Sequence, residues 1–203
     1  LATMTSSGGV ETDVAVKVLH GGLDPRSQAV QRLRDEGRLL GVLNHPAILR
    51  VTDLVLLEGR IALVTEYVEG ADLDECFGAH PPLPPRALLE VIGRVADALH
   101  SAFNTTSANG TPLELIHRDI KPANIRLGRH GDVKLLDFGI ARATHDRREA
   151  KTQTNAVIGS SLYMAPERLD DEGEAEPSSD VFSLGCTLYE GLVGERVFKE
   201  LTL

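Results

Sequence analysis

The stretch His117–Asn124, which reads HRDIKPAN, decides how this chain is interpreted, together with Asp137-Phe138-Gly139 further along. Between them, residues 125–136 predict a β-hairpin, because two apolar runs flank a polar, glycine-containing turn. Such a hairpin places Asn124 and Asp137 at the same end of two adjacent strands.

The polar side chains at that end of the hairpin predict phosphoryl transfer. Asn124 and Asp137 supply two hard oxygen ligands, and Asp119 and Lys121 lie close to them in the sequence. This set suits Mg²⁺ carrying a polyphosphate better than a metal that prefers sulfur or imidazole ligands.

Composition limits the classes of protein and of partner. The chain has 203 residues, of which 42% are hydrophobic, enough for the core of one domain with two lobes. Its net charge of -9 argues against a general nucleic-acid partner. No apolar run reaches the roughly 18 residues of a membrane segment. Two isolated cysteines favour a reducing compartment, so we expect a cytoplasmic location, with any membrane tether outside these residues.

The first third of the chain predicts a small sheet with a helix beside it. Residues 13–19 alternate like a strand, and residues 27–43 carry apolar side chains at helical spacing. Glu36 falls on that apolar stripe, where a carboxylate needs a partner, and Lys17 is the candidate. A buried ion pair unrelated to any site is the alternative. Residues 50–57 and 61–66 predict two further strands.

The remainder of the chain predicts mainly helices. Residues 67–74 are expected to connect the two parts, and residues 86–103 to form a long helix. A last helix is expected to begin at Ser178-Ser179-Asp180, with Val181 among its inward residues. The segment 141–159 has almost no apolar periodicity and is expected to be a mobile switch.

Four ordered motifs resemble the catalytic domain of Ser/Thr protein kinases over nearly the whole chain. They are Val14-Ala15-Val16-Lys17, HRDIKPAN, Asp137-Phe138-Gly139 and Ala165-Pro166-Glu167. The resemblance implies an α+β, two-lobed fold with a small antiparallel sheet lobe and a mainly helical lobe, incomplete in this chain. The N-lobe would span residues 1–66, and the hinge with a partial C-lobe residues 67–203.

The resemblance also implies ATP and Mg²⁺ as cofactors and gives roles to individual residues. Lys17 would contact the α- and β-phosphates and be held by Glu36. Asp119 would accept or orient the substrate proton, and Lys121 would neutralise charge on the phosphoryl group. Asn124 and Asp137 would hold Mg²⁺.

Nucleoside contacts follow from the same resemblance. Ala15 would lie in the nucleotide-anchoring strand, the backbone of Glu66 and Val68 would read adenine, and Asp72 would lie near the ribose. Arg126 stands where relatives commonly place an aliphatic residue beneath adenine. Its methylene stem could form that floor, but the guanidinium puts nucleotide affinity in question.

Substrate class and regulation are implied by the catalytic loop and the segment after it. Lys121, with Ser160 ahead of Tyr163, matches the Ser/Thr pattern, so the partner would be a protein with a Ser or Thr acceptor. Arg118 could bind a phosphate on Thr152 or Thr154, which would order the segment. We expect autophosphorylation through self-association, as in bacterial members.

Both ends of the chain depart from the family pattern. We expect Gly8-Gly9 to form a turn between two strands, which leaves no glycine-rich phosphate loop before Val14, and a chain cut at its N-terminus. The sequence ends soon after the last helix, so Glu167 is expected to lack its partner. Two alternatives stay open: a pseudokinase that serves as a nucleotide-binding scaffold, and a small-molecule phosphotransferase of the same fold.

Overall fold

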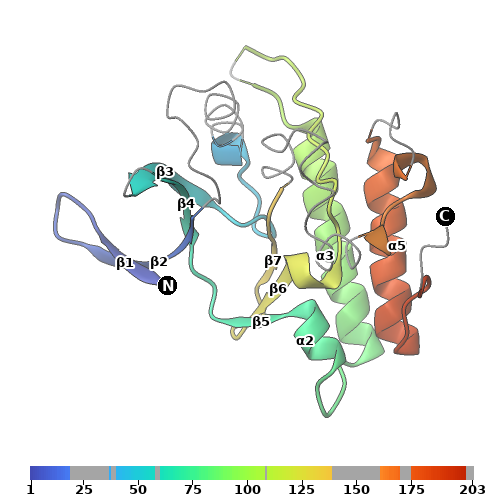
Figure 1. Cartoon of the computed structure of the whole chain (residues 1–203). Coiled ribbons are helices and arrows are strands. Elements are labelled where there is room, and N and C mark those ends of the chain that lie inside the picture. Colours follow the sequence, from blue (N-terminus) through green and yellow to red (C-terminus); the bar gives the residue numbers. More distant parts are fainter. Residues whose placement is uncertain are drawn as a thin grey trace.

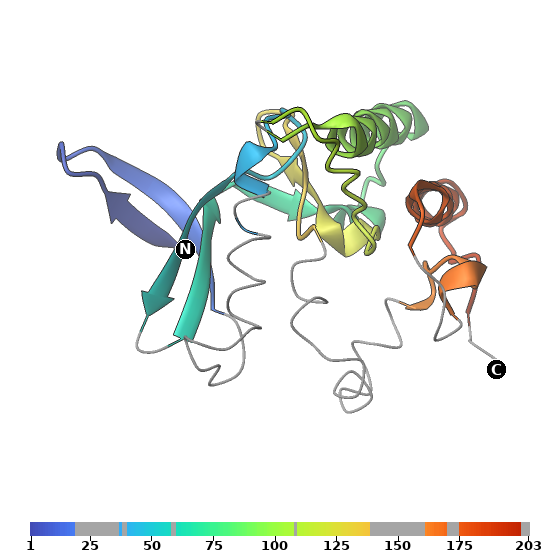
Figure 2. The ribbon, with the colours of Figure 1, turned by 90° about the horizontal axis from the view of Figure 1, so that it is seen from above.

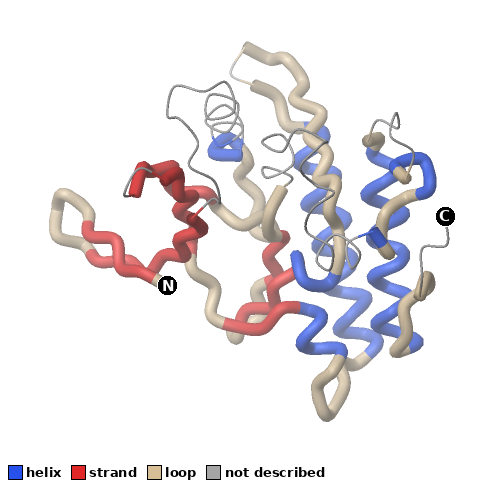
Figure 3. The backbone as a smooth tube through the Cα atoms, in the orientation of Figure 1, coloured by secondary structure: helices blue, strands red, loops and turns tan. Residues whose placement is uncertain are grey.

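The computed structural model describes residues 1–18, 37, 40–57, 60–107, 109–138, 161–169 and 175–199. Within this part, a twisted sheet lies at one end and two long helices lie at the other, with a second small sheet between them (Figure 1). Strands and helices are thus segregated along the molecule (Figure 3). The predicted α+β class, with an antiparallel sheet followed by mainly helical structure, is confirmed.

The first sheet has four antiparallel strands in the order β1-β2-β4-β3. Its members are β1 (Ala2–Thr5), β2 (Glu11–Val18), β3 (Val51–Leu57) and β4 (Arg60–Glu66). The turn between β1 and β2 contains Gly9 at a φ of 79°, a left-handed conformation that glycine adopts without strain. The predicted turn at Gly8-Gly9 is therefore confirmed, and β2 brings Lys17 opposite Leu63 of β4.

The second sheet has the order β5-β6-β7 and contains the predicted hairpin. It consists of β5 (Gly70–Asp72), β6 (Ile125–Gly128) and β7 (Val133–Leu135), with Ile125 paired to Leu135. The strand β5 was expected to be part of a connector over residues 67–74. It pairs with β6, and a Cβ on Gly70 would lie 1.9 Å from the carbonyl oxygen of Leu127, so only glycine permits this close approach.

Helices α3 and α5 run side by side at the other end of the molecule (Figure 2). The predicted helix 86–103 is α3 (Pro85–Asn104), which follows the short α2 (Leu73–Phe77). Gly191 allows α5 (Pro177–Val193) to approach closely, since a Cβ there would lie 2.6 Å from the Leu88 side chain of α3. Two short 3₁₀ turns, η1 (Pro122–Asn124) and η3 (Pro166–Arg168), complete the described elements.

The last helix differs from its prediction in two respects. It begins at Pro177, and its N-cap is Glu176, which forms a capping box with Ser179. Val181 was expected to face inward but is 67% exposed, whereas Leu184 is buried. At helical spacing, Val181 lies at the edge of the apolar stripe that contains Leu184, and this edge is exposed to solvent.

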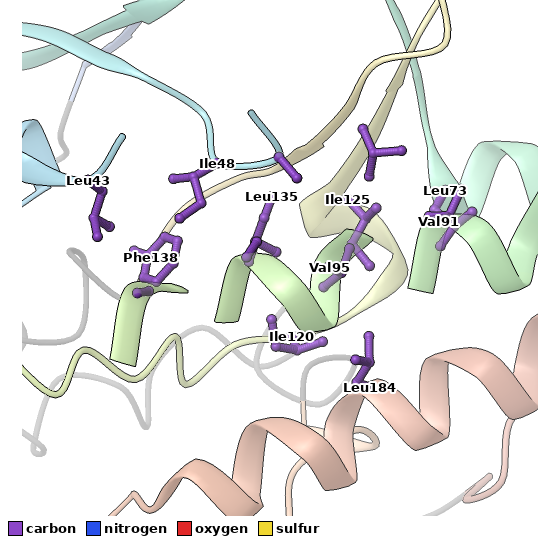
Figure 4. Packing of buried hydrophobic residues seen from close by; sticks show 14 of the residues in the cluster. Leu43, Ile48, Leu73, Val91, Val95, Ile120, Ile125, Leu135, Phe138 and Leu184 are labelled. Atoms are coloured by element: carbon purple, nitrogen blue, oxygen red, sulfur yellow. The ribbon is translucent and has the colours of Figure 1, made fainter. Parts of the chain in front are cut away.

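The main hydrophobic core joins the second sheet to both helices (Figure 4). Side chains from α3, the hairpin, the stretch His117–Asn124 and α5 meet there, including Val95, Leu135, Ile120 and Leu184. Residues 47–49 also dock against β7, where the N–H of Leu135 donates to the carbonyl of Ala47 at 2.8 Å. The core thus holds the hairpin and the stretch His117–Asn124 in fixed relation.

Candidate functional site

The stretch His117–Asn124 brings three predicted site residues together. The Nζ of Lys121 lies 2.9 Å from Oδ2 of Asp119, and Nδ2 of Asn124 donates to the same oxygen at 3.0 Å. Asn124 also donates to the backbone carbonyl of Asp119 at 2.7 Å. The Asp119 carboxylate is therefore positioned by a cation and an amide from its own loop, and its side chain is partly exposed.

The hairpin places Asn124 beside Asp137, as predicted. The backbone N–H of Leu136 donates to the carbonyl of Asn124 at 2.8 Å, which joins the two strand ends. Asp137 has a φ of 52°, in the left-handed region that is costly for most residues with a side chain. This strained residue lies where the chain leaves β7.

Lys17 reaches this end of the hairpin from the first sheet. Its Nζ lies 2.6 Å from Oδ2 of Asp137, although the two residues are 120 positions apart. The side chains are 51% and 42% exposed, respectively. Glu36, the predicted partner of Lys17, lies outside the described residues.

The donor set is compatible with magnesium. With Nδ2 of Asn124 turned to Asp119, its Oδ1 is the atom left to bind a cation, and the Asp137 carboxylate is the second oxygen ligand. Mg²⁺ is commonly held by one or two carboxylates, with substrate phosphates and water completing the shell. No group of three or more His, Cys, Asp or Glu suited to a metal occurs among the residues that the structure describes. The oxygens of Asn124 and Asp137 fit a metal whose remaining ligands come from phosphate and water.

His117 is a structural residue beneath the site. It is fully buried, its Nε2 lies 2.7 Å from the carbonyl of Leu136, and the N–H of Asp119 points to its Nδ1 at 3.3 Å. Burial lowers the pKa of the ring, so the neutral form is favoured, with Nε2 as donor and Nδ1 as acceptor. The ring also packs on Phe138 at 4.7 Å between centroids. These contacts give this histidine a packing role.

Asp180 of α5 anchors the same loop and was missed as a site residue in the sequence. Its two carboxylate oxygens accept the backbone N–H groups of His117 at 2.7 Å and Arg118 at 2.8 Å. Arg118 has a φ of 72°, so the carboxylate stabilises a loop in a strained conformation. In the sequence, Asp180 is an acidic residue in the first turn of a helix. Such residues commonly stabilise helix starts, so its role in the loop could not be recognised.

The predicted nucleoside contacts lie on β2, β4, the connector, β5 and β6. Ala15 is half-buried on β2 opposite Thr65, and Glu66 is bound by its side chain to Lys134 of β7 at 2.8 Å. The carbonyl of Val68 and the carboxylate of Asp72 both accept from Arg126, at 2.7 Å each. Arg126 thus contacts two of the residues that were expected to read the nucleoside.

Some of the remaining predicted residues lie in the described part of the chain, and others do not. Thr152, Thr154 and Ser160 lie outside the described residues, as does the segment 141–159. Arg118 lies in the loop, and its carbonyl accepts from Arg168 at 2.6 Å. Glu167, expected to lack the arginine that would pair with it, accepts a hydrogen bond from the Ser179 hydroxyl at 2.9 Å.

The loop holds the Asp119 carboxylate between a lysine and an amide, and the end of the hairpin carries Asp137 paired with a lysine from the first sheet. Phosphoryl-transfer sites use side chains of these kinds. A family model described as the protein kinase domain matches residues 7–202. The chain belongs to the protein kinase family, whose members use ATP.

Three bacterial proteins illustrate the similarity. The chain is 43% identical to serine/threonine-protein kinase PknB of Mycolicibacterium smegmatis, over 92% of this chain and 29% of that protein. It is 37% identical to tyrosine-protein kinase MasK of Myxococcus xanthus, over 98% and 31%. It is 40% identical to a probable serine/threonine-protein kinase of Streptomyces coelicolor, over 87% and 26%. The chain therefore spans under a third of the length of these relatives.

No helix in the described part of the chain is both long and apolar enough to cross a membrane.

Proposed function

We propose that this chain transfers the γ-phosphoryl group of ATP to serine or threonine hydroxyls of proteins. One observation carries the proposal: Lys121 and Asn124 hold the carboxylate of Asp119, at 2.9 and 3.0 Å, in a loop that ends beside Asp137. A carboxylate fixed in this way can accept or orient the proton of an attacking hydroxyl. The chemistry needs no covalent intermediate on the protein.

The surrounding charges suit the phosphate groups. Lys17 would bind the α- and β-phosphates, with Glu36 as its further partner, and Lys121 would neutralise the transferring group. Asn124 and Asp137 would hold Mg²⁺. When bound, the ion would neutralise the negative charge of the phosphate oxygens. These residues act by position and charge, which is how most catalysis of phosphoryl transfer is achieved.

Serine and threonine are favoured over tyrosine as acceptors. Lys121, which pairs with Asp119 at 2.9 Å, matches the Ser/Thr pattern by its position, and two of the relatives above carry Ser/Thr kinase names. Tyrosine is the second candidate, because MasK is named a tyrosine-protein kinase and is similar over 98% of this chain. The acceptor is therefore part of the test below.

Domain organisation and regulation form the finer part of the proposal. Residues 1–66 would act as the N-lobe and residues 67–203 as the hinge and C-lobe, with ATP between them. Phosphate on Thr152 or Thr154, added by a second copy of the chain, would bind Arg118. The Ser160 hydroxyl would bridge toward Asp119 and Lys121. We place the protein in the cytoplasm, where ATP is available.

The test is incubation of the full-length protein with γ-labelled ATP, Mg²⁺ and a generic protein acceptor. We expect label on serine and threonine, and a loss of at least about 100-fold in Asp119→Asn, because the amide cannot accept the proton. Label on tyrosine would favour the second candidate. Nucleotide binding without transfer would favour a pseudokinase, and label on a small acceptor would favour a small-molecule phosphotransferase.

A further inference from the structure

Arg126 makes a three-pronged contact with the connector between the two sheets. Its Nε donates to the carbonyl of Val68 at 2.7 Å, one terminal nitrogen pairs with Asp72 at 2.7 Å, and the other donates to the carbonyl of Gly70 at 2.8 Å. The guanidinium has a fixed fork of donors, so three simultaneous contacts define its position closely.

This contact lies next to the proposed phosphate site. Arg126 is two residues beyond Asn124, about 7 Å along the strand, and pairs directly with Asp72 in the register of β5 and β6. The connector leads from β4, which pairs with the strand of Lys17, to β5. The strand β6, which carries Arg126, lies between β5 and β7 in the second sheet (Figure 1).

Asp72 is already engaged by its own chain. Besides the ion pair with Arg126, it is the N-cap of α2 in a capping box with Glu75, whose side chain accepts the Asp72 N–H at 2.8 Å. The side chains of Arg126 and Asp72 are 24% and 31% exposed, so solvent competes only partly with their pairing. The carboxylate expected near the ribose thus serves to fix the connector.

We propose that Arg126 withdraws Asp72 from the ribose, so that the site binds ATP with little dependence on the ribose hydroxyls. The inference rests on the proposed nucleotide site and concerns its specificity. A hydroxyl that finds a free carboxylate contributes a strong hydrogen bond, and a carboxylate already paired with one nitrogen of an arginine, as Asp72 is, offers a weaker one. Deoxy-ATP should then bind about as well as ATP.

Calorimetric titration of the full-length protein with Mg²⁺ and ATP, 2′-deoxy-ATP or 3′-deoxy-ATP measures this dependence. For the wild type we expect the three Kd values to agree within about twofold. Arg126→Met keeps an apolar stem and frees Asp72, so at least one deoxynucleotide should bind about tenfold more weakly than ATP. The double variant Arg126→Met with Asp72→Asn should lose this new preference.

Arg129→Met is the matched control. Arg129 also pairs with a connector residue, Glu69, at 2.7 Å, but both side chains are largely exposed. In Arg129→Met, the ratios of the Kd values for the deoxynucleotides to the Kd for ATP should equal those of the wild type. A changed ratio would mean that any arginine near the connector alters the dependence on the ribose hydroxyls.

Two results overturn the inference. One is a wild type that discriminates tenfold against a deoxynucleotide, which decides the matter even if Arg126→Met does not fold. The other is an Arg126→Met variant that folds and keeps the wild-type ratios. A wild type that binds none of the three nucleotides overturns the proposed nucleotide site and the inference with it. Phosphoryl transfer is scored separately, so failure of the proposed function is distinguishable.

Discussion

The loop His117–Asn124 and the Lys17–Asp137 pair are held in different ways. The loop is fixed from below by buried groups, with Asp180 binding two of its backbone N–H groups and His117 packed beneath it. Lys17 and Asp137 instead meet from two separate sheets, through one ion pair with about half of each side chain exposed. The difference teaches that substitutions in the loop's anchors should affect folding, whereas substitutions in the exposed pair should affect chemistry alone.

The largest expected effect is on activity, from Lys17→Met. Removing the ammonium proposed to bind the phosphates should lower phosphoryl transfer at least about 100-fold. The melting temperature should change by no more than about 2 °C, because a half-exposed ion pair contributes little to stability. Initial rates of transfer and a thermal melt check both parts.

Lys199→Met serves as the control for that variant, since Lys199 pairs with Glu195 at 2.7 Å in an exposed ion pair far along the chain. Lys199→Met should change neither the rate of phosphoryl transfer nor the melting temperature. A strongly lowered melting temperature in Lys17→Met would mean that the pair is structural.

A second, smaller effect is expected on stability from Asp180→Asn. The amide has a single oxygen, so one of the backbone N–H groups of His117 and Arg118 loses its acceptor in a buried position. The free energy of unfolding should fall by about 1–3 kcal/mol. Denaturant unfolding of the wild type and the variant measures the difference.

Asp97→Asn is the matched surface change. Asp97 pairs with His45 at 3.1 Å, but its side chain is 74% exposed, so its loss should cost under about 1 kcal/mol. Equal costs for the two variants would contradict the contrast between buried anchors and exposed pairs.

The smallest effect is the pH dependence of stability from His117. Burial lowers its pKa below the ordinary value of 6.5, so the unfolded chain binds a proton that the folded chain resists. This contribution is fully present above pH 6.5 and is lost as the pH falls through the lowered pKa. Unfolding free energies measured from pH 7.5 to 5.5 should decrease, and less steeply in His117→Gln.

His100→Gln, on the exposed surface of α3, should keep the steeper decrease of the wild type. If the unfolding free energy of His117→Gln falls with pH as steeply as that of the wild type, the pH dependence arises from other groups.

The sequence predicted the elements whose signals are local. The hairpin after Asn124 and the helix α3 followed from alternation and from helical spacing, which a single segment displays by itself. The strand β5 escaped prediction because it is three residues long and depends on β6, more than fifty residues later. Short strands without their partners resemble connectors.

The candidate site was predicted in its backbone arrangement but not in its side-chain pairing. Asn124, Asp137 and Asp119 could be placed together from the hairpin, since strand ends meet by geometry. The anchoring role of Asp180 and the three contacts of Arg126 depend on tertiary packing across more than fifty residues. Composition and periodicity carry no signal for such contacts, and the adenine floor expected of the Arg126 stem stays a prediction.

The most direct test of the account is whether Mg²⁺ and ATP bind together through Asp137. Calorimetric titration of the full-length protein with ATP, in the presence and absence of Mg²⁺, should show tighter binding with the metal in the wild type. Asp137→Asn should lose most of that enhancement while keeping the wild-type melting temperature within about 2 °C. The same Mg²⁺ dependence in Asp137→Asn would contradict the proposed metal and nucleotide site.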